Sequence, residues 1–215
     1  MRGIILIATL LMTAVSAAGA LDVDLKAYDA ARRRGEIVSV EGRVYNERRK
    51  PNADDQPIPH ATVVLLPRSE ALLRRLDDLR AHARDSLAAY RDAATKMRQA
   101  REAFEREVWE SGSPELVVTT VVDSGGRFAL ADIPAGRWLM WVTHSEFVSA
   151  HSPNIPSRER GRFRLSPRLV GYYAERAWLR ELEMTPGMVA TVDLNDRNIW
   201  FAGVVEDRVL DAGSR

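Results

Sequence analysis

Apolar and polar residues alternate in several short segments of the chain, which is the pattern of half-buried β-strands. Segments rich in Val, Ile, Thr and aromatic residues, each bounded by turn residues, predict strands over 37–45, 60–67, 115–123, 127–133 and 138–144. Later in the chain, residues 177–196 predict two strands around a Pro-Gly turn, and residues 198–206 predict a last strand. The Ser-, Pro- and Arg-rich segment 145–168 predicts a loop, and the segment around residues 172–178 has a mixed pattern.

One long segment has a different pattern. Residues 69–111 contain neither Gly nor Pro and are dominated by Ala, Leu, Arg, Glu and Gln, so they predict helix. Ser69 is placed to cap its start, and Gly112 and Pro114 follow its end. Apolar residues repeat along it at a spacing of about 3.5 residues, typical of a coiled coil, and this spacing predicts a stripe that needs a partner surface. The stripe consists of Leu72, Leu76, Leu79, Ala83, Tyr90, Met97 and Phe104.

The length of this helical segment leaves two arrangements open. A continuous helix would run roughly 65 Å at about 1.5 Å per residue, although both of its ends must return to strands of one small domain. The segment is therefore either a helical hairpin that turns near residues 82–88 or one helix that overhangs the domain. No Gly or Pro marks a turn, but Asp85 and Ser86 could cap a second helix. We favour the hairpin.

The N-terminus has the layout of a secretory signal peptide. Arg2 precedes an apolar run from Ile4 to Val15, and small residues follow, with Ala18-Gly19-Ala20 or Val15-Ser16-Ala17 as cleavage patterns. The alternative is an uncleaved anchor, but the run is shorter than the roughly 20 residues that a spanning helix needs. The chain has no Cys, which excludes a lipid-modified cysteine and thiolate metal sites. We expect a periplasmic or secreted protein with no membrane span in its mature form.

Charge and composition narrow the classes of partner. The formal net charge is +1, with 28% charged and 46% hydrophobic residues. The chain therefore has no strong positive electrostatic field that would favour binding to nucleic acid. The Arg-rich and Ala-rich composition is typical of a GC-rich bacterial genome.

The order of the β motifs resembles the carboxypeptidase regulatory-like domain family, whose fold is a transthyretin-like (prealbumin-like) β-sandwich. The resemblance covers residues 37–66 and 115–194 and departs from the family at His60, at Trp138 and in the helical insertion. Its motif positions are Gly42 (with Val40 and Val44), Pro59 and Ala61 (with Val63), Asp123, Gly126 and Phe128 (with Thr120), Pro134 and Gly136 (with Ile133), and Pro186 with Gly187. The resemblance implies an Ig-like, mainly β sandwich with a long helical insertion.

These motif residues also have a local physical reading. Asp123 can accept hydrogen bonds from the turn that follows it, and Gly125 or Gly126 can supply a positive φ. Phe128 then points into the core, and the turn at Pro134 and Gly136 fixes the register of the next strand. We interpret this hairpin as scaffold.

Candidate chemistry is sparse. His144 and His151, with Glu146 nearby, could form a metal site, although surface histidines on a loop explain them better. Asp54, Asp55 and the run Asp193, Asn195 and Asp196 could offer oxygen ligands to Ca²⁺, but their spacing is not that of an EF-hand and favours turns. Some transthyretin-like proteins hydrolyse a purine-derived ring; their C-terminal Tyr-Arg-Gly-Ser signature is absent, because this chain ends DAGSR.

Two surfaces could bind a ligand. Trp138 and Trp141 face opposite sides of one strand, so one of them could be exposed. A sugar-stacking platform could include those two with Tyr172, Tyr173, Trp178 and Trp200, although most are expected to fill the core. The basic segment 157–168 could contact an anionic surface, although a solvated loop explains it better.

The sequence thus predicts a signal peptide (1–20), a sandwich (21–68 and 112–205), a helical insertion (69–111) and a tail expected to fray (206–215). We expect a non-enzymatic exported envelope protein without cofactor or catalytic residues. Its helical stripe and the 145–168 loop would bind another envelope protein or a second copy. The alternatives are a carbohydrate-binding module that uses exposed aromatics and, less well supported, a loop-based hydrolase or metal enzyme.

Overall fold

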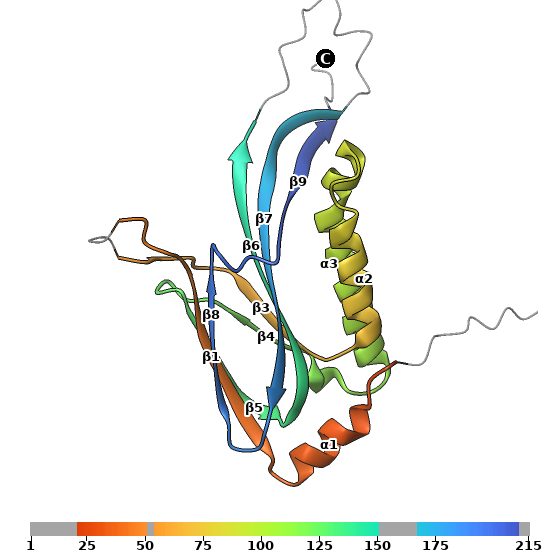
Figure 1. Cartoon of the computed structure of the whole chain (residues 1–215). Coiled ribbons are helices and arrows are strands. Elements are labelled where there is room, and N and C mark those ends of the chain that lie inside the picture. The colour runs from red at the N-terminus through yellow and green to blue at the C-terminus, as the bar shows by residue number, and fades with distance from the viewer. Residues whose placement is uncertain (1–20, 51–53, 151–166, 211–215) are drawn as a thin grey trace, which may run out of the picture.

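The computed structural model describes residues 21–50, 54–150 and 167–210, which form two β-sheets and a layer of helices (Figure 1). The four-stranded sheet contains β1 (Ile37–Asn46), β2 (Gln56–Pro57), β5 (Arg127–Pro134) and β8 (Val189–Asn195). Strand β1 pairs antiparallel with β2 and β5 and parallel with β8. The fold is therefore the mainly β sandwich with a helical insertion that the sequence predicts.

The five-stranded sheet is antiparallel throughout. Its order is β4 (Val118–Val121), β3 (Thr62–Pro67), β6 (Gly136–Ser149), β7 (Pro167–Met184) and β9 (Phe201–Leu210). A short 3-10 turn, η1 (Pro114–Leu116), leads from the helices into β4. Strands β6 and β7 are much longer than the strands of the four-stranded sheet, and Figure 1 shows them running past its end together with β9.

The helical insertion is a hairpin, as predicted. Helix α2 (Glu70–Ala81) begins at Ser69, whose Oγ accepts a hydrogen bond from the Leu72 amide at 3.0 Å. Helix α3 (Leu87–Glu110) begins at Ser86, whose Oγ accepts one from the Ala89 amide, also at 3.0 Å. The turn therefore needs no Gly or Pro, because a serine cap satisfies the free amides at the start of the second helix. The hairpin lies along one face of the five-stranded sheet (Figure 1).

The five-stranded sheet is covered on both faces. From β6 and β7, Trp138 and Trp178 point toward the sandwich interior, and the Trp178 indole donates to the Asn195 carbonyl of β8 at 2.8 Å. Trp141, on the other face, lines a cavity together with Ala94 and Met97 of α3. Both Trp138 and Trp141 are buried, as favoured for most of these aromatic residues, because the helical layer covers the face that an ordinary sandwich leaves to solvent.

The lead-in contains helix α1 (Leu25–Arg33), which closes one end of the sandwich. Tyr28 of this helix packs edge-on against Trp138, with ring centroids 5.0 Å apart, and its hydroxyl donates to the Arg137 carbonyl. No helix in the described ranges is both long enough and apolar enough to span a membrane.

Two expectations about the C-terminal half are corrected. The tail predicted from residue 206 is instead the end of β9, which pairs with β7 as far as Leu210; residues 211–215 lie outside the described residues. The mixed segment around 172–178 belongs to β7, an 18-residue strand, and the predicted loop is shortened because residues 145–149 continue β6. Strand β7 pairs with β6 along one edge and with β9 along the other. This pairing holds residues 145–149, 172–178 and 206–210 in extended conformation.

Candidate functional site

The predicted helical stripe lies inside the protein. Leu72, Leu76, Met97 and Phe104 are buried, and Leu79 packs against the core. Ala83 is also buried, and Tyr90 is half-buried. The partner surface that the stripe requires is thus the protein's own sheet and the facing helix. The expectation that the stripe is an exposed protein-binding surface is corrected: these side chains are not available to a second protein.

The family-like motif residues lie in turns and core of the scaffold. The Arg127 amide donates to Asp123 Oδ1 at 2.8 Å, and Gly126, with φ of 78°, supplies the positive φ of this turn. Ala61 and Phe128 are buried, and the Pro134 carbonyl accepts the Trp138 indole N–H at 2.9 Å. The remaining motif positions are Gly42 in β1, Pro59 before β3, Gly136 at the start of β6, and Pro186 with Gly187 in the β7–β8 turn.

Gly42 is required by close packing. A Cβ at this position would lie 2.1 Å from the Val192 carbonyl oxygen and 2.7 Å from the Phe128 ring. The Phe128 ring therefore covers the strand where the side chain of residue 42 would stand. This explains the V-x-G-x-V pattern of β1 as a packing requirement.

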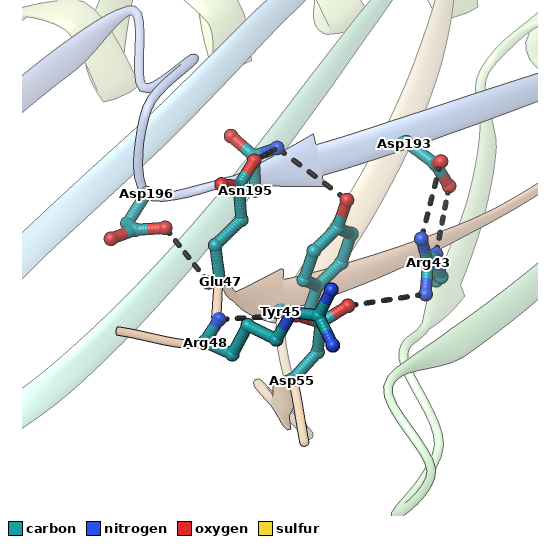
Figure 2. Close-up of polar contacts among 8 residues, drawn as sticks. All are labelled: Arg43, Tyr45, Glu47, Arg48, Asp55, Asp193, Asn195 and Asp196. Atoms are coloured by element: carbon teal, nitrogen blue, oxygen red, sulfur yellow. Dashed lines mark hydrogen bonds and ion pairs between the residues drawn. The ribbon is translucent and has the colours of Figure 1, made fainter. Parts of the chain in front are cut away.

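A polar cluster joins the end of β1 to the end of β8 (Figure 2). The Arg43 guanidinium lies between two carboxylates, at 3.1 Å from Asp193 and 3.6 Å from Asp55, and also over the Tyr45 ring. Asn195 donates to Glu47 Oε1 at 2.8 Å. These contacts attach the segment after β1 to a strand about 150 residues away in the chain.

The oxygen ligands considered for Ca²⁺ do come close together here, but they already have partners. Asp55 and Asp193 bind Arg43, and Asp55 Oδ1 also accepts the Arg48 amide at 3.1 Å. Asp196 Oδ1 accepts the Glu47 amide at 2.9 Å, while Asp54 is exposed. An arginine at the centre of the cluster opposes a cation, so the cluster is a structural clamp.

Of the predicted histidine site, the structure describes His144 and Glu146. His144 lies 3.3 Å from the Arg176 guanidinium, whose other nitrogen donates to Asn46, and Glu146 lies 4.0 Å from Arg176. Burial, followed by the charge of Arg176, lowers the pKa of His144 below its ordinary value. His151 lies outside the described residues. In the part of the chain that the structure describes, no group of three His, Asp or Glu side chains could hold a metal ion.

The predicted sugar-stacking platform is not present as a plane. Trp138, Trp141 and Trp178 are buried. Trp200 is partly buried, edge-on to Trp141 and beneath the Arg80 guanidinium. Among the described residues, the aromatic side chains with the largest exposed fraction are Trp109 at the end of α3 and a pair on β6 and β7, one of which is Tyr173 of the predicted platform.

That pair is the main exposed aromatic feature of a projecting part of the fold. We call residues 144–149, 171–176 and 202–207 of β6, β7 and β9 the β-arm; their register pairs Ser149 with Gly171 and Arg176 with Ala202. On it, Phe147 is 47% exposed and Tyr173 is 40% exposed, with ring centroids 5.2 Å apart and planes inclined by 59°. A Cβ at Gly171 would lie 2.3 Å from the Phe147 ring, so this ring lies directly on the backbone of the neighbouring strand.

The aromatic pair of the β-arm was only half visible in the sequence. The sequence offers Tyr173 as a platform residue, but its pattern places Phe147 in a loop. The spacing of Gly171 and Tyr173 is the one local signal of this pair: residues two apart share one face of a strand, so a glycine there leaves room for an aromatic ring beside Tyr173. Recognising it required knowing that residues 145–149 and 171–175 pair with each other, which is a long-range contact.

Comparison with known proteins gives distant similarities. No protein-family model matches the chain, and no curated protein matches it. A structure of a candidate carbohydrate-binding protein from Pseudomonas aeruginosa is 14% identical with a TM-score of 0.42, and the alignment covers 81% of this chain and 99% of that chain. The pilus backbone protein RrgB from Streptococcus pneumoniae is 13% identical with a TM-score of 0.27, over 74% of this chain and 40% of that chain. Neither similarity carries a function to this chain.

Proposed function

We propose that the chain is a non-enzymatic exported protein of the bacterial envelope that binds another envelope protein through the β-arm. The observation that carries this proposal is the exposed pair Phe147 and Tyr173 on strands that extend beyond the sandwich. Aromatic residues are enriched at protein interfaces and contribute much of their binding energy. The helical hairpin, whose apolar stripe is buried, supports the sheet from which the β-arm extends.

Export is supported by the apolar run Ile4–Val15 and the small residues after it. The carboxypeptidase regulatory-like family is supported by motif residues that occupy turn and packing positions: Gly42 under the Phe128 ring and Gly126 and Gly187 at positive φ.

Site-specific photo-crosslinking in the source organism tests the proposal. A photoreactive phenylalanine analogue replaces Phe147, and in a matched control it replaces Val121, which is 56% exposed on an edge strand away from the β-arm. We expect a discrete crosslinked adduct from position 147 that position 121 does not give. Mass spectrometry then identifies the partner. No adduct at position 147, or the same adducts at both positions, would contradict the proposal.

A further inference from the structure

A second feature is a cavity of about 240 Å³ between α3 and the five-stranded sheet, to which the β-arm contributes Ser145 and Glu175. Its floor includes Trp141 and Phe201, and its roof includes Met97. Charged side chains from both layers also face it: Arg98 and Arg101 from α3, and Glu175 from β7. The cavity is therefore lined by both apolar and charged side chains, in a region that otherwise forms the core between a helix and a sheet.

The charged groups of the cavity lack good hydrogen bonds. The Arg101 side chain is only 14% exposed, and its buried Nε has no hydrogen-bond partner in the described part of the chain. Its ion-pair contacts to Glu105 and Glu102 are 3.4 Å and 3.6 Å long. Buried polar groups are almost always satisfied by protein, water or ligand, so the Arg101 Nε is a donor that a water or a ligand in the cavity would satisfy.

Glu175 is the complementary group on the sheet side. Its side chain is 15% exposed, and its one contact among the described residues is an ion pair with Arg98 at 3.7 Å. Burial raises the pKa of Glu175, against the lowering effect of Arg98 and Arg101. A carboxylate acceptor and a guanidinium donor thus face the same enclosed space without a direct hydrogen bond to any described group.

Hydroxyl groups surround these charges. Thr62, Thr143 and Ser145 line the cavity, and each hydroxyl can both donate and accept a hydrogen bond. We propose that this cavity binds a small neutral polyhydroxylated ligand, of the size of one sugar ring. Sugar hydroxyls would donate to Glu175 and accept from Arg101, while the apolar face of the ring would lie toward Trp141 and Phe201.

Other ligand classes fit the lining less well. A cation would be repelled by Arg98 and Arg101, and an anion would face the Glu175 carboxylate across the same small space, so a neutral ligand is the class that meets no like charge. The cavity is smaller than the roughly 300–1,000 Å³ that encloses drug-sized ligands, so a single ring is the size that suits it. This site differs from the predicted exposed platform, because its aromatic floor is enclosed between helix and sheet.

Calorimetric titration of the chain without residues 1–20 tests the proposal. The probes are D-glucose, D-galactose and N-acetyl-D-glucosamine, with malonate as the anionic comparison. We expect saturable binding of at least one neutral sugar with a Kd near or below about 1 mM. The same sugar should raise the Tm, whereas malonate should give neither effect.

Two variants and a control locate the binding. Glu175→Gln removes the charged acceptor with little change of shape, and Ser145→Leu covers the exposed rim; each should weaken sugar binding at least tenfold. Arg106→Gln, on the exposed face of α3, should leave binding unchanged. Unaltered Tm values without sugar show that the variants are folded. The proposal is overturned if no sugar binds, if malonate binds better, or if both variants bind like the parent chain.

Discussion

The buried stripe of the hairpin makes a quantitative prediction about stability. Leu76 in α2 is completely buried, so Leu76→Ala removes three buried carbon groups, each worth about 0.8 kcal/mol on transfer from water. The cavity that remains adds to this loss, because a packed layer relaxes only in part. We therefore expect the free energy of unfolding to fall by about 3 kcal/mol.

Urea unfolding followed by tryptophan fluorescence and circular dichroism measures this loss. The matched control is Leu87→Ala in α3, because Leu87 is 64% exposed and its truncation should cost less than about 0.5 kcal/mol. In both variants, the free energy of unfolding should fall with urea concentration at the same slope as in the parent chain. Equal, small losses for Leu76→Ala and Leu87→Ala would refute the reasoning, because Leu76 would then not be packed between helix and sheet.

Three further substitutions test other parts of the fold. Gly42→Ala should destabilise the chain by about 3 kcal/mol or more in urea unfolding, since its Cβ meets the Val192 carbonyl. Gly125→Ala should cost much less, because its Cβ would lie 3.3 Å from the end of the Asp123 side chain and not against backbone. Because the pKa of His144 is lowered in the folded chain, the unfolded chain binds a proton at this histidine more readily. The contribution of His144 to the free energy of unfolding is therefore complete above the ordinary pKa of 6.5 and is lost as pH falls below it. A plot of Tm against pH should show a smaller loss for His144→Gln than for the parent chain. Asn195→Ala should cost about 1–3 kcal/mol in thermal unfolding, because the side chain accepts two backbone amides in a buried turn, and a neutral result would contradict its clamping role.

Local signals in the sequence predicted much of the fold. Serine caps and helix-forming composition predicted the hairpin, and Ser69 and Ser86 cap its two helices as expected. The motif glycines marked places where the backbone has a positive φ or where another residue packs closely, and Gly126 and Gly42 do so. These features depend on residues a few positions apart, so the sequence displays them directly.

Features set by distant contacts were not visible in the sequence. The strand β7 contains many Arg, Glu and Tyr residues and forms because it pairs on both edges, which its own composition does not reveal. The spacing of Trp138 and Trp141 predicts that they face opposite sides of the sheet, but it does not reveal that α3 covers the second face. The cavity likewise depends on Arg101 and Glu175, which lie far apart in the chain and meet only after the hairpin packs.

Hydrogen exchange measured by mass spectrometry tests most directly whether the hairpin is a layer of the core. The account predicts that amides in the buried half of α3, from Ala93 to Val108, exchange as slowly as those of the central strand β6. Both segments would then open only with global unfolding. Exchange of α3 at the rate of an isolated helix, well ahead of β6, would show a detached helical arm and would contradict the account.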